Sequence, residues 1–408
     1  MHKPAPYPEI LTRVDRSVST PTHVYFERTI RQQIGRLDEA LQAVPHRLLY
    51  AMKANSHPVI LRQFLAAGVG IDAVSPAELL LAIRVGFPID RILFSANNMT
   101  DAEMHFAKRQ GVLLNIGELS RLEAFGAAYP GSDVCVRLNP QIGAGHHAHV
   151  ITAGNRSKFG IPVAMNAEIR RIIARHDLRL AGLHQHIGSG IPDPATLWEA
   201  VSVILKIAEE FPGLDFVNLG GGLGVPYRPE EKRIDLQGFA ERFGETLSEF
   251  SKKHKAEVWF EPGRFFVAEA GVMLVTATTI KDNGDICFVG VDSGMGHLVR
   301  PALYGSYHEI LNLSNPEGPL RTYDVVGNIC ETGDTFAHGR EVPEIREGDC
   351  LAILDTGAYG QSMATDYNLR PLPAEVWVPE DNPARFRTIT ERQSPAALVA
   401  AILSKSLD

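Results

Sequence analysis

Residues 48–86 read LLYAMKANSHPVILRQFLAAGVGIDAVSPAELLLAIRVG and contain one pattern twice. A short apolar run (48–53, then 69–74) is followed each time by a segment with apolar residues at helical spacing and a final glycine. Continuous apolar runs are typical of parallel strands that are buried on both faces. Before the second helical segment, Ser75, Pro76 and Glu78 form the pattern of a helix start with a capping box. The stretch therefore predicts two consecutive β/α units.

The same alternation continues to about residue 264. Further candidate strands lie at 91–96, 112–116, 134–139, 181–187, 215–221 and 257–263, with helical patterns between them. Thr100 and Glu103 repeat the capping box. Eight β/α units in about 240 residues predict a (β/α)8 barrel. A doubly wound open sheet is the alternative, but it would normally carry a glycine-rich nucleotide turn after the first strand, where this chain has KANSHP.

After residue 265 the sequence changes to short strands separated by turn residues, for example at 322–329, 349–357 and 374–379. This pattern of short strands and turns predicts a mostly antiparallel β-sandwich or β-barrel domain. The strand-like residues 23–29 are expected to join it, and 394–404 to form a closing helix. We therefore predict a barrel domain of residues 28–270 and a β domain of residues 1–27 and 271–408.

Composition excludes several classes of protein. The chain has 408 residues, 45% of them hydrophobic, and a formal net charge of −8, which argues against non-specific binding to nucleic acid or anionic membranes. No apolar run approaches the roughly 18–20 residues of a membrane span, and the first residues contain no signal-peptide pattern. The four cysteines form no CxxC pair. We expect a cytoplasmic protein with no membrane and no nucleic-acid partner.

Polar residues stand where the predicted barrel strands end, and barrels of this type place their functional groups at the C-terminal ends of the strands. These residues are Lys53, Asp72, Arg137, His184, His186, GSG (188–190), GGGLG (220–224) and EPGR (261–264). Each has an ordinary structural explanation, such as a solvated lysine or a tight glycine turn. Their convergence on one end of one barrel favours a site.

The combination predicts pyridoxal 5′-phosphate (PLP) as cofactor. Consecutive glycines let backbone N–H groups approach a phosphate, and Ser189 can add a donor. A lysine at the barrel mouth can form a Schiff base with an aldehyde. A carboxylate such as Glu261 can keep a pyridine nitrogen protonated, which makes the ring an electron sink. A histidine beside the phosphate loop can stack on a flat ring.

Seven motifs in this order resemble the fold-type III PLP-dependent decarboxylases, and among these most closely the diaminopimelate decarboxylases. The motifs are YAMKANSHP (50–58), HQHIGSG (184–190), NLGGGLGVPY (218–227), FEPGRF (260–265), RPALYGSYHEI (300–310), CETGD (330–334) and GAYGQSMATDYNLRPLPAEVWV (357–378). The resemblance implies a PLP-binding barrel, a β-sandwich-like second domain and a homodimer. It also implies decarboxylation of meso-diaminopimelate, at its D-configured centre, to L-lysine and CO2.

The resemblance assigns a role to each site residue. Lys53 is implied as the Schiff-base lysine, His186 as the ring-stacking histidine and Glu261 as the partner of the pyridine nitrogen. Further cofactor contacts are implied for Asp72, Arg137, Ser189, Gly221, Gly222, Gly263, Arg264 and Tyr359. Cys330 is implied as the proton donor, supplied together with Glu331 by the second subunit. Arg264, Arg300, Tyr304, Glu331 and Tyr359 are implied as substrate-binding residues. Forked arginine side chains suit the distal carboxylate of the substrate.

Three alternatives stay open. A decarboxylase of this fold could act on D-ornithine, D-lysine or a carrier-linked amino acid. A racemase or a transaminating enzyme could use the same barrel. A racemase needs a second base facing the lysine across the ring, and a cysteine acid fits decarboxylation better. A regulatory homologue typically loses the lysine or the acid, and this chain has both. His146, His147 and His149 lack the cysteine or carboxylate partners of a metal site, so we expect no metal, and the 143–154 loop could instead gate the site.

Overall fold

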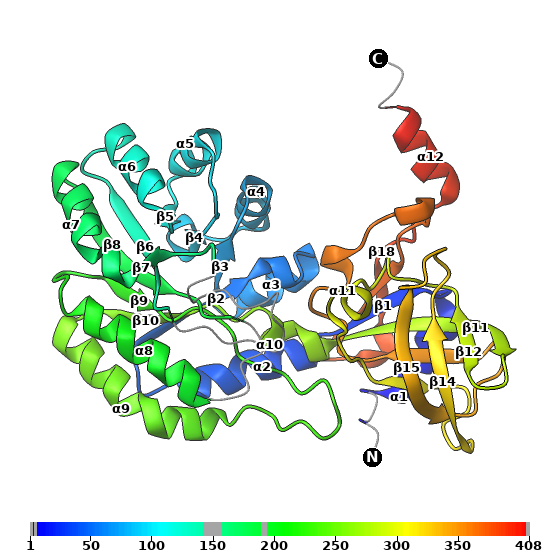
Figure 1. Cartoon of the computed structure of the whole chain (residues 1–408). Helices are drawn as coiled ribbons and strands as arrows, with labels where there is room; N and C mark the ends of the chain where they lie inside the picture. The colour runs from blue at the N-terminus through cyan, green and yellow to red at the C-terminus, as the bar shows by residue number, and fades with distance from the viewer. Residues whose placement is uncertain (1–2, 4–5, 142–156, 189–193, 405–408) are drawn as a thin grey trace. The chain divides into compact units, whose positions relative to one another are not determined.

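The computed structural model describes residues 3, 6–141, 157–188 and 194–404. The chain divides into two compact units (Figure 1). The barrel unit comprises Gln32–Val225 and Arg233–Phe265. The β unit comprises Met1–Arg31, Pro226–Lys232 and Phe266–Asp408. Each unit is therefore discontinuous in sequence, and the short segment Pro226–Lys232 leaves the barrel unit to pack with the β unit.

In the described part of the barrel unit, eight parallel strands close on themselves. Around the barrel the order is β5, β4, β3, β2, β10, β9, β8, β6, and the pairing of β5 with β6 completes the ring. This confirms the predicted (β/α)8 barrel and excludes the open sheet. The strands are β2 (His46–Ala51), β3 (Gly70–Ala73), β4 (Ile92–Phe94), β5 (Leu113–Ile116), β6 (Asp133–Asn139), β8 (Arg179–Gln185), β9 (Phe216–Asn218) and β10 (Glu257–Phe260), with the short β7 (Ile161–Pro162) beside β6.

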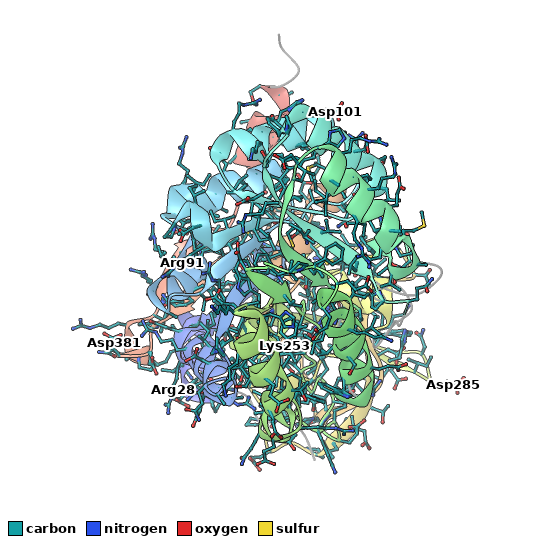
Figure 2. All side chains as sticks on the ribbon, turned by 90° about the vertical axis from the view of Figure 1, so that its left-hand side faces the viewer. Arg28, Arg91, Asp101, Lys253, Asp285 and Asp381 are labelled. Atoms are coloured by element: carbon teal, nitrogen blue, oxygen red, sulfur yellow. The ribbon has the colours of Figure 1, made fainter. Side chains whose placement is uncertain are left out.

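Helices alternate with these strands, and charged side chains cover their outer faces. Figure 2 shows Arg91, Asp101 and Lys253 at the outside of the unit. One of the two predicted capping boxes forms in full: Thr100 and Glu103 cap each other's backbone. At Ser75 only half of the box forms, because Ser75 Oγ accepts from Glu78 N at 3.2 Å while the Glu78 side chain accepts from Val74 N instead. The helices are α2 (Glu27–Ala40), α3 (Pro58–Ala66), α4 (Pro76–Val85), α5 (Asp101–Gln110), α6 (Leu119–Ala128), α7 (Asn166–Arg175), α8 (Pro194–Ala208) and α9 (Leu236–His254). Residues 27–29, expected to be strand, begin α2 instead.

Side chains from neighbouring strands pack tightly in the barrel core. Phe216 stacks on Trp259 with ring centroids 3.6 Å apart. A Cβ on Gly182 would lie 2.2 Å from the Phe216 ring, so only glycine leaves room for that ring on the neighbouring strand. The core is therefore packed, and the functional groups stand at the strand ends.

The β unit contains, among the described residues, nine strands in one mixed sheet. Most pairs are antiparallel, as predicted, but β1 pairs with β17 and β12 with β14 in parallel. Strand β1 lies between β11 and β17, which places residues 23–26 in this sheet. The strands are β1 (Thr22–Phe26), β11 (Gly271–Asp282), β12 (Cys287–Val291), β13 (Ile310–Asn312), β14 (Leu320–Val326), β15 (Thr335–Pro343), β16 (Cys350–Ile353), β17 (Ala374–Val378) and β18 (Arg387–Thr390).

Short helices accompany this sheet. The predicted closing helix forms as α12 (Pro395–Leu403), whereas α1 (Pro8–Ser17) was not predicted. The five-residue α11 (Arg300–Tyr304) forms the first part, RPALY, of the RPALYGSYHEI motif. Within the described ranges, no helix is long and apolar enough to span a membrane.

Candidate active site

Lys53 stands at the carboxyl end of β2, in the 3-10 turn Met52–Ala54 rather than in the strand. Met52 and Ala54 are buried on either side of it, whereas 44% of the lysine side chain is exposed. Its Nζ lies 3.8 Å from Oδ2 of the buried Asp72, which follows from the register of β3 beside β2. A Cβ on Gly263 would approach Ala51 O at 3.0 Å, so the EPGR turn packs closely on the lysine turn because it has a glycine there.

Adjacent strands bring a layer of polar side chains to the level of Glu261. The strand register places Arg137 beside His184, and His184 beside Asn218. Glu261 directly follows β10, and its two oxygens accept from His184 Nε2 at 2.9 Å and Asn218 Nδ2 at 2.6 Å. All four side chains are buried. The sequence therefore places these groups on different strands, and barrel closure assembles them.

The charges in this layer shift the pKa values in opposite directions. Burial opposes ionisation of Glu261, but His184, the charge of Lys53 and the Asn218 amide outweigh it and lower the pKa of Glu261. Burial, together with the charge of Glu261, raises the pKa of Asp72 to about 7, with Lys53 opposing the shift. Burial also lowers the pKa of Arg137, and the charges of Glu261 and Asp72 oppose that shift. Glu261 thus keeps its negative charge at neutral pH.

The glycine loop after β9 lies against the Glu261 turn. A Cβ on Gly221 would lie 2.5 Å from the Glu261 carbonyl oxygen, and Gly220 and Gly222 have positive φ angles of 74° and 104°. The Gly221 N–H donates to Nδ1 of the half-buried His186 at 3.1 Å, which fixes the imidazole ring. Burial and the charges of Arg137 and Lys53 hold the pKa of His186 well below its usual range, so its ring is neutral.

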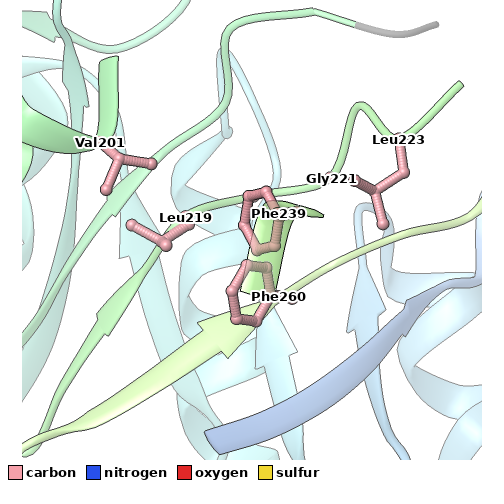
Figure 3. A pocket seen from close by; sticks show the side chains of 7 residues that line it. Val201, Leu219, Gly221, Leu223, Phe239 and Phe260 are labelled. Carbon is pink, nitrogen blue, oxygen red and sulfur yellow. The ribbon is translucent and has the colours of Figure 1, made fainter. Parts of the chain in front are cut away.

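A small apolar pocket lies beneath this loop. Figure 3 shows the Phe239 and Phe260 rings next to Gly221, and the ring centroids are 6.3 Å apart in an edge-to-face arrangement. The pocket is lined by Val201, Leu219, Gly220, Gly221, Leu223, Phe239 and Phe260. This packing gives the glycine loop a firm apolar base.

The barrel residues fit PLP. In the cradle of Gly220, Gly221 and Gly222, the first two have no room for a side chain and the third has a positive φ angle. Glu261 is an ionised acceptor, and Lys53 is an accessible amine beside a buried carboxyl group. Arg264 is buried at the start of α10 (Arg264–Val267). Arg137 donates to Asn97 Oδ1 at 3.2 Å and lies 4.9 Å from the Phe159 ring centroid. Ser189 lies outside the described residues, as does the whole of the 143–154 loop with its three histidines.

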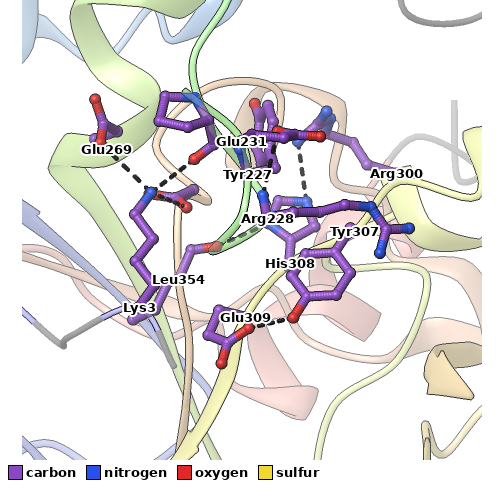
Figure 4. A network of polar contacts seen from close by, with 12 residues as sticks. Lys3, Tyr227, Arg228, Glu231, Glu269, Arg300, Tyr307, His308, Glu309 and Leu354 are labelled. Carbon is purple, nitrogen blue, oxygen red and sulfur yellow. Dashed lines mark hydrogen bonds and ion pairs between the residues drawn. The ribbon is translucent and has the colours of Figure 1, made fainter. Parts of the chain in front are cut away.

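In the β unit, Arg300 is held inside a polar network (Figure 4). It is only 1% exposed, and its guanidinium donates to His308 Nε2 at 2.9 Å and lies 4.6 Å from the Tyr227 ring centroid. His308 Nδ1 donates to the Leu354 carbonyl at 2.7 Å, so its Nε2 is left as an acceptor. Tyr304 is half-buried at the end of the same short helix. Tyr227 belongs to Pro226–Lys232, a few residues after the glycine loop.

Three other predicted residues also belong to the β unit. Cys330 and Glu331 lie in the loop between β14 and β15 and are exposed. Tyr359 is half-buried with φ of 59°, a left-handed conformation that is uncommon for a bulky residue and concentrates at functional sites. In the described part of the chain, no group of three or more His, Cys, Asp or Glu side chains could hold a metal ion.

Sequence reasoning missed three residues that the geometry singles out. Asn218 binds the Glu261 carboxylate, and its signal was a lone amide at the end of an otherwise apolar strand. Tyr227 and His308 contact Arg300, and both stand inside the motifs already noted. Their roles depend on long-range contacts, which spacing along the chain does not encode.

Comparison with known proteins places the chain in a family. Residues 27–268 match the model of the pyridoxal-dependent decarboxylase pyridoxal-binding domain. The chain is 43% identical to a diaminopimelate decarboxylase of Methanothermobacter thermautotrophicus, covering 92% of this chain and 90% of the relative. It is 35% identical to that of Escherichia coli K12, covering 96% of each.

A solved structure agrees with these matches. The diaminopimelate decarboxylase of Helicobacter pylori, complexed with L-lysine, superimposes with a TM-score of 0.87 at 30% identity, covering 97% of this chain and 100% of that one. Barrel, site residues and full-length similarity lead to one conclusion. The chain belongs to the diaminopimelate decarboxylase family of pyridoxal-dependent decarboxylases.

Proposed function

We propose that the protein decarboxylates meso-2,6-diaminopimelate to L-lysine and CO2 with PLP as cofactor, as the last step of lysine synthesis. The observation that carries the proposal is the set of Lys53, Glu261 and the glycine cradle at one end of the barrel, in a chain whose full-length relatives bear this enzyme's name. The Helicobacter pylori relative holds L-lysine, which is the product of the proposed reaction.

When bound, PLP supplies the electron sink that accepts the electrons of the broken C–C bond. Lys53 would hold the cofactor through Nζ, and Glu261 would keep a proton on the ring nitrogen through its ionised carboxylate. His186, fixed by Gly221, would stack on the ring. Asp72 and Arg137 would support the lysine and ring, while Ser189, Gly221, Gly222, Gly263, Arg264 and Tyr359 would bind the phosphate.

The proposed substrate class rests on residues that suit the distal carboxylate and the distal ammonium of diaminopimelate. Arg264 and Arg300 are proposed to bind the distal carboxylate, with Tyr304 and Tyr359 beside it. Glu331 would take the distal ammonium, and Cys330 Sγ would give its proton to the α carbon that has lost CO2. We propose that Cys330 and Glu331 come from the partner subunit of a homodimer. A cytoplasmic location remains a prediction from the sequence, and cell fractionation would test it.

The first experiment is a substrate screen on the purified holoenzyme. CO2 release is measured with meso-diaminopimelate, D-ornithine, D-lysine and L-ornithine separately, alongside the visible absorbance of the bound cofactor. We expect cofactor absorbance and CO2 from diaminopimelate alone. CO2 from another amino acid would refute the substrate assignment, and no absorbance after PLP is added would refute the enzyme assignment.

A matched pair of lysine variants assigns the chemistry to one position. Lys53→Ala is expected to abolish both turnover and the visible absorbance. Lys253→Ala removes an exposed lysine on α9, where it pairs with Glu209, and should leave both unchanged. Full activity in Lys53→Ala would contradict the role of Lys53.

A further inference from the structure

In the β unit, residues 367–370 lie along the loop that carries Cys330 and Glu331. Tyr367 Oη donates to Glu331 Oε1 at 2.6 Å. Asn368 Nδ2 donates to Cys330 Sγ at 3.2 Å. Arg370 donates to the carbonyl of Asn328 at 3.1 Å. Residue numbers rise along 367–370 while the numbers of their partners fall from 331 to 328, so the two segments run antiparallel. We call Tyr367–Arg370 the strap.

The loop under the strap is fixed at its base. Asp334 is buried, and its carboxylate accepts from Ile329 N at 2.7 Å and Met295 N at 2.5 Å. The Gly327 N–H donates to the Asp334 carbonyl at 2.9 Å, which closes the loop. The backbone that carries Cys330 and Glu331 is therefore held by the bonds of Asp334, and the strap contacts fix the two side chains.

The backbone of the strap has an unusual conformation. Asn368 and Leu369 have positive φ angles of 58° and 53° in succession. Asparagine tolerates this region better than most residues, whereas leucine does not. Burial does not explain the arrangement, because Tyr367 and Leu369 are 43% and 55% exposed. The strained turn instead brings adjacent side chains onto adjacent residues of the facing loop, and such strain is typical of functional sites.

The two contacts suit two different tasks. An amide N–H on sulfur favours the thiolate, which is the form that remains after Cys330 has given up its proton. A phenol O–H on a carboxylate is a charge-assisted hydrogen bond that fixes the orientation of the Glu331 carboxylate. The hydrogen bond to Glu331 raises the pKa of Tyr367, so the phenol keeps the proton that it donates.

We propose that Asn368 and Tyr367 are positioning residues, Asn368 for the Cys330 thiol and Tyr367 for the Glu331 carboxylate. The proposal rests on the proposed roles of Cys330 and Glu331. In the proton-transfer step the S–H bond breaks, a C–H bond forms at the α carbon, and the negative charge left on Sγ is stabilised by the Asn368 amide. The thiol recovers its proton from solvent.

The first test measures the thiol directly in the full-length holoenzyme. The rate of alkylation of Cys330 by iodoacetamide is followed by peptide mass spectrometry in wild type, Asn368→Gly and Asn368→Asp. Glycine keeps the left-handed backbone without the side chain, and aspartate keeps the shape without the donor. Near neutral pH we expect alkylation to slow about tenfold, the scale of one lost hydrogen bond. In strongly alkaline buffer, where thiols are ionised, the rates should converge.

Two controls separate this effect from general loosening. Cys287 on β12 is half-buried and is read in the same digest, so its alkylation rate serves as an internal reference. Asp177→Gly makes a similar change at an exposed residue with φ of 53°, in the turn before β8. It should leave both alkylation rates and turnover unchanged.

The second test separates the two contacts kinetically. Asn368→Gly should lower kcat with little change in KM, because proton donation follows substrate binding. Tyr367→Phe should raise KM for diaminopimelate several-fold with a smaller effect on kcat, because it loosens the group proposed to bind the ammonium. If the two variants change kcat by the same factor and also change KM by the same factor, the division of roles between Asn368 and Tyr367 is overturned.

Failure of the strap and failure of the proposed function give different results. An unchanged ratio of Cys330 to Cys287 alkylation in Asn368→Gly overturns the positioning of the thiol, whatever happens to turnover. Undiminished kcat in Cys330→Ala overturns the proposed role of Cys330, and with it the catalytic purpose of Asn368. Slower alkylation of Cys330 together with lower kcat in Asn368→Gly supports both the positioning of the thiol by Asn368 and the catalytic role of Cys330.

Discussion

Two carboxyl groups near Lys53, those of Glu261 and Asp72, have opposite protonation preferences. The pKa of Glu261 is lowered because His184, Lys53 and the Asn218 amide outweigh the effect of burial. The pKa of Asp72 rises to about 7 because it is buried and close to the Glu261 charge. Such separation of two carboxyl groups is how one site holds a permanent anion and a titrating group side by side. Asp72 therefore adjusts the charge beside the lysine near neutral pH.

This pair predicts a pH dependence of stability in the cofactor-free protein. The carboxyl of Asp72 has a higher pKa in the folded than in the unfolded chain, so its contribution to stability is present at acid pH and lost as pH rises to about 7. We expect Asp72→Asn to gain stability over wild type progressively from about pH 4 to 7, at most about 1.4 kcal/mol per pH unit, and then level off. Urea unfolding at several pH values measures the difference. A difference that is constant across this range would contradict the shift.

At the scale of elements, each predicted barrel strand forms, but the site depends on where the strands end. The apolar run 48–53 predicted a strand that includes Lys53, and β2 ends at Ala51 instead. Apolar periodicity reports burial, and the buried Met52 and Ala54 extend the pattern through a turn. The glycine loop and the Glu261 turn, which lie on different strands, meet at the same end of the barrel because the strands are parallel.

That contact between loops gives a prediction for Gly221. In Gly221→Ala the new Cβ would lie 2.5 Å from the Glu261 backbone, so the loop or the Glu261 turn has to shift. We expect PLP affinity to fall at least tenfold and stability to fall by about 1–3 kcal/mol. Titration of the cofactor-free protein with PLP, followed by visible absorbance, measures the affinity. Gly244→Ala on α9, where the added Cβ meets nothing within 4 Å, is the control, and equal PLP affinity in both variants would refute the cradle.

The sequence predicted the barrel well and the β unit only in outline. Alternating β/α units pair in chain order, so local patterns determine the barrel topology. In the β unit, β1 pairs with β17 and β12 with β14 across long insertions, and no local pattern specifies such partners. The same limit explains the site: Lys53 and Glu261 stand out in their motifs, whereas Asn218, Tyr227 and His308 acquire meaning only from the residues they contact.

At the scale of the whole molecule, the proposed homodimer predicts complementation between two inactive variants. Lys53→Ala and Cys330→Ala homodimers should each be inactive or nearly so. If Cys330 serves the partner's site, random mixing makes about half of the dimers mixed, and each mixed dimer has one intact site. We expect recovery of about a quarter of wild-type activity after co-expression. No recovery, with mixed dimers confirmed by differential tags, would place Lys53 and Cys330 of one subunit in the same site.

The pairing of β1 also has a consequence for how the chain is made. All five residues of β1 are buried, and Tyr25 hydrogen-bonds to Glu375, 350 residues further along the chain. At 5–20 residues per second, a ribosome needs roughly 20–70 s to supply that neighbour. During this time the nascent chain carries a strand whose buried neighbours are incomplete: one edge lacks its partner until β11 is made, and the other until β17 is made. We therefore expect the first 30 residues or so to be a principal binding site for chaperones during synthesis.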